Sequence, residues 1–179
     1  MSVNPGSEGA KDAREGPDEQ EVRIIDAIKQ NEAFQPRVWE RLDRDQQLVA
    51  LQETENTIAG IQGRASLPVR VWKGGEEGEY GGYNGYEILI GEYSIENDSV
   101  NEVVNTLAHE GRHAYQDYAI EHPDVHHDPD EVAAWRDNIY SAGYIDPDDD
   151  PIGYRNQPVE GDAWAYGDRI EAGIYGGEG

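Results

Sequence analysis

The sequence has no cysteine among its 179 residues, which excludes disulfide bonds and any metal site built on thiolates. It also has no apolar run near the roughly 20 residues that a membrane-spanning helix needs. The first residues, Met1–Gln20, are polar and acidic and lack the apolar segment of a signal peptide. We therefore expect a soluble protein, cytoplasmic by default, in which any metal is held by histidine and carboxylate.

Positive charge is also scarce. The chain has 14 Lys and Arg residues against 38 Asp and Glu, which gives a formal net charge of −24 at pH 7. Nucleic acids and anionic membranes are bound through clustered basic side chains. The composition therefore predicts neither a nucleic-acid partner nor a membrane partner.

Length and local composition suggest the domain organisation. Residues 1–17 combine Gly, Pro, Ser, Asp and Glu without apolar periodicity, which is typical of a disordered acidic leader. The remaining residues, 18–179, have the length of one domain with its own core. We predict a single domain there and expect one functional site.

Two helical stretches are predicted in the N-terminal part. Asp18 and Glu21 resemble a capping box, and apolar residues at helical spacing then predict a helix that ends near Pro36. The same periodicity continues over Arg37–Ile61, with a break predicted around Asp43–Asp45.

The middle of the chain changes to the alternation of β-strands. Leu67–Trp72 alternates in this way, the glycine-rich Gly74–Gly85 is predicted as a turn or loop, and Tyr86–Ile90 is predicted as the returning strand. Glu92–Ile95 is a candidate third segment. These strands predict a small antiparallel sheet.

The next helix has the clearest boundaries. Ser99 and Glu102 form a capping box, and the apolar pattern predicts a helix over Val100–Glu121. In the acidic segment that follows, we predict one short helix around Glu131–Ser141.

This well-defined helix carries the motif H-E-x-x-H, formed by His109, Glu110 and His113. Four residues are just over one helical turn, so both imidazoles project from one side and can bind one zinc ion. Glu110 lies about 100° around the helix from His109 and can reach a water at the metal. The spacing therefore predicts a zinc site with a neighbouring general base.

A catalytic zinc site needs a third protein ligand. A metzincin would have histidine six residues after His113, but that residue is Ala119. Glu160 is the better candidate, since it opens a helix predicted from near Pro158 through Ile170, with Asn156 as its cap. The small residues of this helix permit close packing on its neighbour: Gly161, Ala163, Ala165 and Gly167.

These motifs resemble the gluzincin branch of the zincin metallopeptidases, in which a second helix donates a glutamate ligand. The minigluzincins and the metallopeptidase domains of bacterial polymorphic toxins are similar in layout. The resemblance carries over to four residues: His109, Glu110, His113 and Glu160.

The sequence departs from the thermolysin-like pattern around the third ligand. Val159 precedes Glu160, and Trp164 stands four residues after it, where that pattern has asparagine and aspartate. Asp162 and Asp146 therefore remain alternative ligands, the latter reminiscent of an aspzincin arrangement.

The resemblance implies an α+β, zincin-like fold of N-terminal helices, a small antiparallel sheet and the two metal-bearing helices. The edge strand near Tyr86–Ile95 would line the cleft, and a peptide would bind there as an added strand. Zinc would activate water and polarise the scissile carbonyl, while Glu110 would pass the proton to the leaving amine.

A hydrogen-bond donor to the developing oxyanion is still needed. Tyr154 is the leading candidate, and Tyr166, His126 and His127 are the alternatives. A second metal at His126, His127 and Asp128 is disfavoured, because adjacent side chains diverge from the backbone.

Two further side chains of the motif helix have predicted partners. Asp117 lies one turn beyond His113 and is a candidate to orient its imidazole. Arg112 is predicted to point away from the metal, toward Asp162 or Asp168.

The sequence thus predicts a zinc-dependent peptidase whose partners are a peptide or protein substrate and an inhibitor or immunity protein. Its negative charge favours basic or neutral peptides. The alternative is a zinc-stabilised binding or effector domain of the toxin type that cleaves little.

Overall fold

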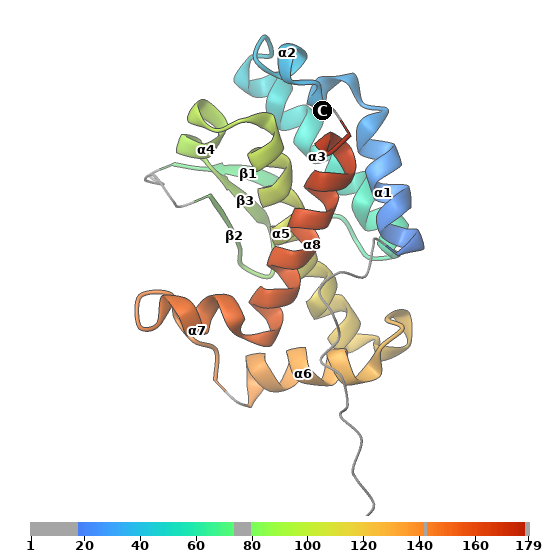
Figure 1. The fold of residues 1–179 in the computed structure, drawn as a ribbon, viewed down its shortest axis with the longest axis vertical. Helices are drawn as coiled ribbons and strands as arrows, with labels where there is room; N and C mark the ends of the chain where they lie inside the picture. The colour runs from blue at the N-terminus through green and yellow to red at the C-terminus, as the bar shows by residue number, and fades with distance from the viewer. Residues whose placement is uncertain (1–17, 74–79, 142, 178–179) are drawn as a thin grey trace, which may run out of the picture.

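The computed structural model describes residues 18–73, 80–141 and 143–177 (Figure 1). The predicted leader at residues 1–17 lies outside them. The described part is rich in helix and contains one small mixed sheet, an α+β composition. Its elements are α1 (Glu19–Lys29), η1 (Glu32–Phe34), α2 (Pro36–Trp39), α3 (Arg44–Gln62), β1 (Val69–Trp72), β2 (Gly81–Tyr83), β3 (Ile88–Gly91), α4 (Glu92–Asn97), α5 (Val100–Glu121), η2 (Pro123–Val125), α6 (Pro129–Tyr140), α7 (Pro151–Asn156) and α8 (Pro158–Tyr175).

The sheet differs from the predicted antiparallel pair. Its strand order is β1-β3-β2, with β3 parallel to β1 and antiparallel to β2. The prediction missed β2, because two of its three residues are Gly81 and Gly82, and glycine is rare in strands. Of the predicted loop Gly74–Gly85, residues 74–79 lie outside the described residues and residues 81–83 form this strand. Because β2 returns on the far side of β3, the strand predicted as the partner of β1 runs parallel to it.

The segment Glu92–Ile95, a candidate strand, is wrong as predicted and belongs to helix α4. Glu92 and Glu96 are four residues apart and therefore share one helix face. Both contact Arg44 at the start of α3, at 3.6 and 2.6 Å. This charge spacing is a helical signal that the apolar pattern does not contain.

The first helix is shorter than predicted. It ends at Lys29 rather than near Pro36, because Asn31 caps a separate turn, η1, through the backbone N–H of Ala33. The predicted break around Asp43–Asp45 is confirmed, since Asp43 forms a full capping box with Gln46 at the start of α3.

Helix α5 has the predicted boundaries and the predicted capping box. Helix α6 is close to its prediction, whereas α7 was not predicted. Helix α8 begins at Pro158 as predicted, but Gln157 and not Asn156 is its N-cap, and no side chain caps it. None of the described helices is long and apolar enough to cross a membrane.

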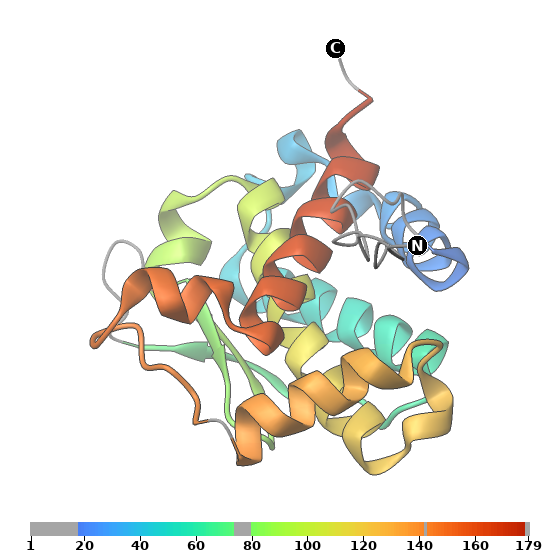
Figure 2. The ribbon, with the colours of Figure 1, turned by 60° about the horizontal axis from the view of Figure 1, so that its bottom comes forward.

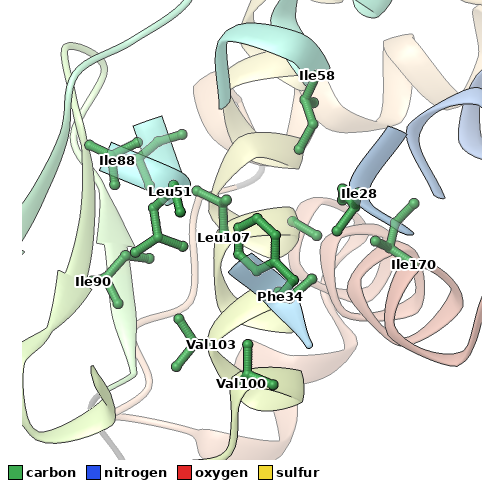
Figure 3. Packing of buried hydrophobic residues seen from close by; sticks show 14 of the residues in the cluster. Ile28, Phe34, Leu51, Ile58, Ile88, Ile90, Val100, Val103, Leu107 and Ile170 are labelled. Atoms are coloured by element: carbon green, nitrogen blue, oxygen red, sulfur yellow. The ribbon is translucent and has the colours of Figure 1, made fainter. Parts of the chain in front are cut away.

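Helices α5 and α8 pack along each other at the centre, with the sheet beside α5 and with α6 and α7 at one end (Figures 1 and 2). Gly167 lies at their close approach, where a Cβ would be 3.2 Å from the backbone oxygen of Asn105 and 2.6 Å from its side-chain Oδ1. Leu107 of α5 lies within the main core, with residues of the sheet on one side and of α1 and α8 on the other (Figure 3). The packing thus fixes α5 against α8, the two helices that carry the predicted ligands.

Candidate metal centre

The two histidines of the motif lie side by side on α5. His109 Nε2 and His113 Nε2 are 3.1 Å apart, and the two rings meet edge to face. His109 is buried and His113 is partly buried. Helical spacing and surrounding packing therefore direct two imidazole nitrogens at one point.

Glu160 in the first turn of α8 meets the same point. Its Oε2 lies 3.4 Å from His109 Nε2, and its Oε1 lies 3.5 Å from His113 Nε2. Glu160 is 1% exposed, yet its Oε2 has no hydrogen-bond donor. An unpaired buried carboxylate oxygen is costly. The three side chains, whose ligand atoms lie within 4.8 Å of one another, can hold a metal ion.

The other two candidates for the third ligand lie elsewhere. Asp162 forms two hydrogen bonds with Arg112, at 2.7 and 3.0 Å, as predicted for that arginine. Asp146 is exposed and accepts a hydrogen bond from the backbone N–H of Asp148. Among the described residues, only Glu160 joins the histidine pair.

A chain of hydrogen bonds behind His113 determines which ring nitrogen carries its proton. Gln116 donates its amide N–H groups to Val159 O and Asp162 Oδ2, at 2.9 and 2.7 Å. Its carbonyl oxygen therefore accepts from His113 Nδ1, at 2.9 Å. Neutral His113 is thus held with a lone pair on Nε2, the form that binds a metal.

The predicted partner of His113, Asp117, has a different contact. It accepts a hydrogen bond from the Tyr83 hydroxyl at 2.8 Å, while Gln116 takes the imidazole. The orienting residue is therefore three positions after His113 and not four. Asp168, the alternative partner for Arg112, bonds Asn105.

Charge and burial shift the titration of the centre. Burial alone would lower the pKa of His113, but the hydrogen-bonding and charged Glu160 outweighs it and raises the pKa to about 9. Burial would raise the pKa of Glu160, yet the two imidazoles and a tyrosine hold it well below its usual value. Burial raises the pKa of Glu110, against the opposing influence of the imidazoles. A buried carboxyl with a raised pKa is suited to accept a proton.

Two tyrosines lie at the centre. Tyr154, the predicted oxyanion donor, lines the cleft at the point where the two motif histidines and Glu160 converge, which we call the metal point. Burial and the charge of Glu160 raise the pKa of Tyr154 to about 12. Tyr144, which the sequence did not identify, donates a hydrogen bond to Glu160 Oε1. Gln157, itself buried, holds the neighbouring Ile145 backbone through both its N–H and its C=O. No local pattern in the sequence reveals a contact across 16 positions.

The other oxyanion candidates lie away from the metal point. Tyr166 is buried and contacts Gln62 at 3.4 Å. His126 is buried against Tyr115 and Glu131, at 3.2 and 2.8 Å. Their polar atoms already have partners. His127 is exposed, and among the described residues no metal-binding group includes it or its neighbours His126 and Asp128.

An open cleft passes over the metal point in two halves. The tryptophan half, of about 640 Å³, is lined by Trp72, Tyr80 and Trp164. The tyrosine half, of about 590 Å³, is lined by Tyr83, Tyr140 and Tyr144. Both halves are also lined by four residues of the centre: Gly81, His109, Glu110 and Tyr154.

The edge strand beside the cleft is β2, whereas the prediction placed this edge near Tyr86–Ile95. A Cβ at Gly81 would lie 2.6 Å from Thr106 Cγ2 and 3.3 Å from Glu110 Cγ. Glycine is therefore required for β2 to lie directly against the motif helix. The approach places the outer edge of the sheet alongside Glu110.

Comparison with protein-family models, with curated proteins and with solved structures finds no match to this chain.

Proposed function

We propose that this chain is a zinc-dependent peptidase of the zincin type, with a gluzincin-like ligand set. The observation that carries the proposal is the convergence of His109, His113 and Glu160 on one point, with Glu110 beside it in an open cleft. A site that only stabilised the fold would need neither the cleft nor the fourth side chain. Catalytic zinc sites typically have three protein ligands and an open position.

The spacing and the chemistry of the ligand atoms are compatible with zinc. Ligands about 2.0–2.1 Å from a tetrahedral zinc ion are about 3.3–3.4 Å apart from one another. At the site, His109 Nε2 lies 3.1 Å from His113 Nε2 and 3.4 Å from Glu160 Oε2, while the other carboxylate oxygen, Oε1, lies 3.5 Å from His113 Nε2. Each carboxylate oxygen therefore faces one imidazole nitrogen, and one ligand atom from each residue lies within 4.8 Å of the others. Two imidazoles and one carboxylate also form a common catalytic zinc set.

The protein's own residues divide the chemistry between them. Zinc held by the three ligands supplies Lewis acidity, which lowers the pKa of water and polarises a carbonyl. Glu110 takes the proton of the attacking water and delivers it to the leaving amine. Tyr154 donates its phenol proton in a hydrogen bond to the developing oxyanion. Tyr144 positions Glu160 through its hydrogen bond to the carboxylate.

The substrate is an extended peptide. In the described sheet, β2 pairs only with β3, so its outer edge can accept a further strand along the cleft. Main-chain hydrogen bonds to this edge would place a scissile carbonyl beside Glu110.

A screen of denatured proteins and peptides with zinc-loaded protein tests the proposal. We expect cleavage that a chelator abolishes and that added zinc restores, because zinc binding to the three side chains is reversible. Mass spectrometry of the products locates the cut bonds. A zinc-loaded, folded protein that cuts none of them would instead favour a zinc-stabilised binding or effector domain.

A further inference from the structure

The tryptophan half of the cleft is lined by a positively charged side chain, Arg155, which has no role in the proposed hydrolysis. Arg155 in the last turn of α7 is the only lysine or arginine that lines either half of the cleft, as far as the described residues show. The other charged groups of this half are carboxylates. Of these, Glu102 caps the start of α5, through the backbone N–H of Ser99 at 2.9 Å.

Arg155 has no acidic partner among the described residues, although the chain has 38 acidic and 14 basic residues. Its guanidinium carbon lies 4.7 Å from the centre of the Trp164 ring. This stacking on the indole holds the planar group in place and leaves its edge N–H donors free.

Trp164 in turn lies against the metal centre. Its ring centre is 4.5 Å from that of His109. The Arg155 guanidinium carbon is therefore no more than about 9 Å from the centre of the His109 ring, a span of two to three extended residues at about 3.3–3.6 Å each. A substrate group two or three residues from the scissile bond can reach it.

We propose that Arg155 and Trp164 form a subsite for a carboxylate of the peptide substrate. The carboxylate is the free C-terminus, or an acidic side chain, two or three residues from the scissile bond. Guanidinium binds carboxylate through two parallel hydrogen bonds, and the indole gives the neighbouring side chain an apolar surface. The inference deepens the proposed function and rests on it.

The positive charge of this subsite is opposite in sign to the net charge of the protein. A net charge of −24 repels anionic peptides, so the exposed Arg155 at the wall of the cleft decides where a carboxylate can bind. If the C-terminus is bound, the enzyme removes two or three residues from chain ends. If a side chain is bound, it cuts within chains near Asp or Glu.

Two peptide libraries distinguish these cases. Both are N-acetylated pentapeptides of random sequence, one with a free C-terminal carboxylate and one as the C-terminal amide. The zinc-loaded protein is compared with Arg155→Gln, with Arg155→Lys, and with Arg23→Gln as a control for the same loss of charge on an exposed arginine of α1 outside the cleft. Thermal unfolding checks that each variant is folded.

We expect the free-acid library to be cut about five- to tenfold faster than the amide library at low substrate concentration. The preference should disappear in Arg155→Gln, be partly kept in Arg155→Lys, and be unchanged in Arg23→Gln. The loss should appear mainly in KM, because Arg155 does not contact the reacting atoms. Enrichment of Asp or Glu near the cut bond in the amide library, lost in Arg155→Gln, would identify a side chain as the source of the carboxylate.

Equal cleavage of both libraries, unchanged in Arg155→Gln and without acidic enrichment, would overturn this subsite and leave the peptidase proposal standing. If no peptide is cut, equilibrium dialysis of the same libraries against zinc-loaded Glu110→Gln protein decides separately. Selective retention of carboxylate-bearing peptides, lost on adding Arg155→Gln, would support the subsite without the peptidase. Equal or absent retention would overturn both.

Discussion

The Glu110→Gln variant is expected to lose peptidase activity by a factor of at least about 100 while keeping its fold and its metal. Glutamine has the shape of glutamate but cannot accept the proton of the attacking water. Glu110 is buried beside the metal point and is not one of the three grouped ligands, so metal binding does not depend on it. Cleavage rates and zinc content, measured on the same preparation, separate the two effects.

The control for this variant is Glu121→Gln. Glu121 ends the same helix and is exposed, so the same chemical change is made far from the cleft. It should leave the cleavage rate unchanged. If Glu110→Gln cuts peptides as fast as the unmodified chain, Glu110 is not the general base.

The Glu160→Ala variant is expected to bind zinc at least about a hundredfold more weakly, because a three-ligand site then keeps only its histidine pair. Zinc affinity is measured by competition with a chromogenic chelator. Asp146→Ala serves as the control, since among the described residues this exposed carboxylate accepts a hydrogen bond only within its own loop. Equal zinc affinity in Glu160→Ala and the unmodified chain would remove Glu160 as a ligand.

For Asp162 we predict a role in folding stability and not in metal binding. Its removal would leave the buried Arg112 without its ion pair, a loss that costs about 3–5 kcal/mol of folding stability. It would also remove one acceptor that holds Gln116 in place. A drop in the unfolding temperature of Asp162→Ala, with zinc still bound at low temperature, would distinguish this structural role from ligation.

The helices that could be predicted best are those whose ends are fixed by neighbouring residues. Ser99 and Glu102 determine the start of α5 within four residues of sequence, and the motif histidines follow by helical spacing. Two strands of the sheet, β1 and β3, were predicted, but their parallel pairing was not, because the strand between them in sequence, β2, consists of Gly81, Gly82 and one tyrosine. Its position depends on contact with α5 and not on strand propensity.

In the site, too, residues within one local motif could be predicted, whereas contacts between distant elements could not. His109, His113 and Glu110 follow from one motif, and Glu160 from the family resemblance with a helix of small residues. Gln116 could not be distinguished from Asp117 on an isolated helix, because α8 supplies the groups that hold its amide. Tyr144 was missed for the same reason, since its contact with Glu160 joins a loop to a helix.

Metal analysis of the purified protein tests the central claim most directly. We expect about one zinc ion per chain after exposure to zinc, removed by a chelator and absent from the His109→Ala/His113→Ala double variant. A full complement of zinc in that double variant, or no zinc in the intact folded chain, would contradict the assignment of His109, His113 and Glu160 as a metal centre.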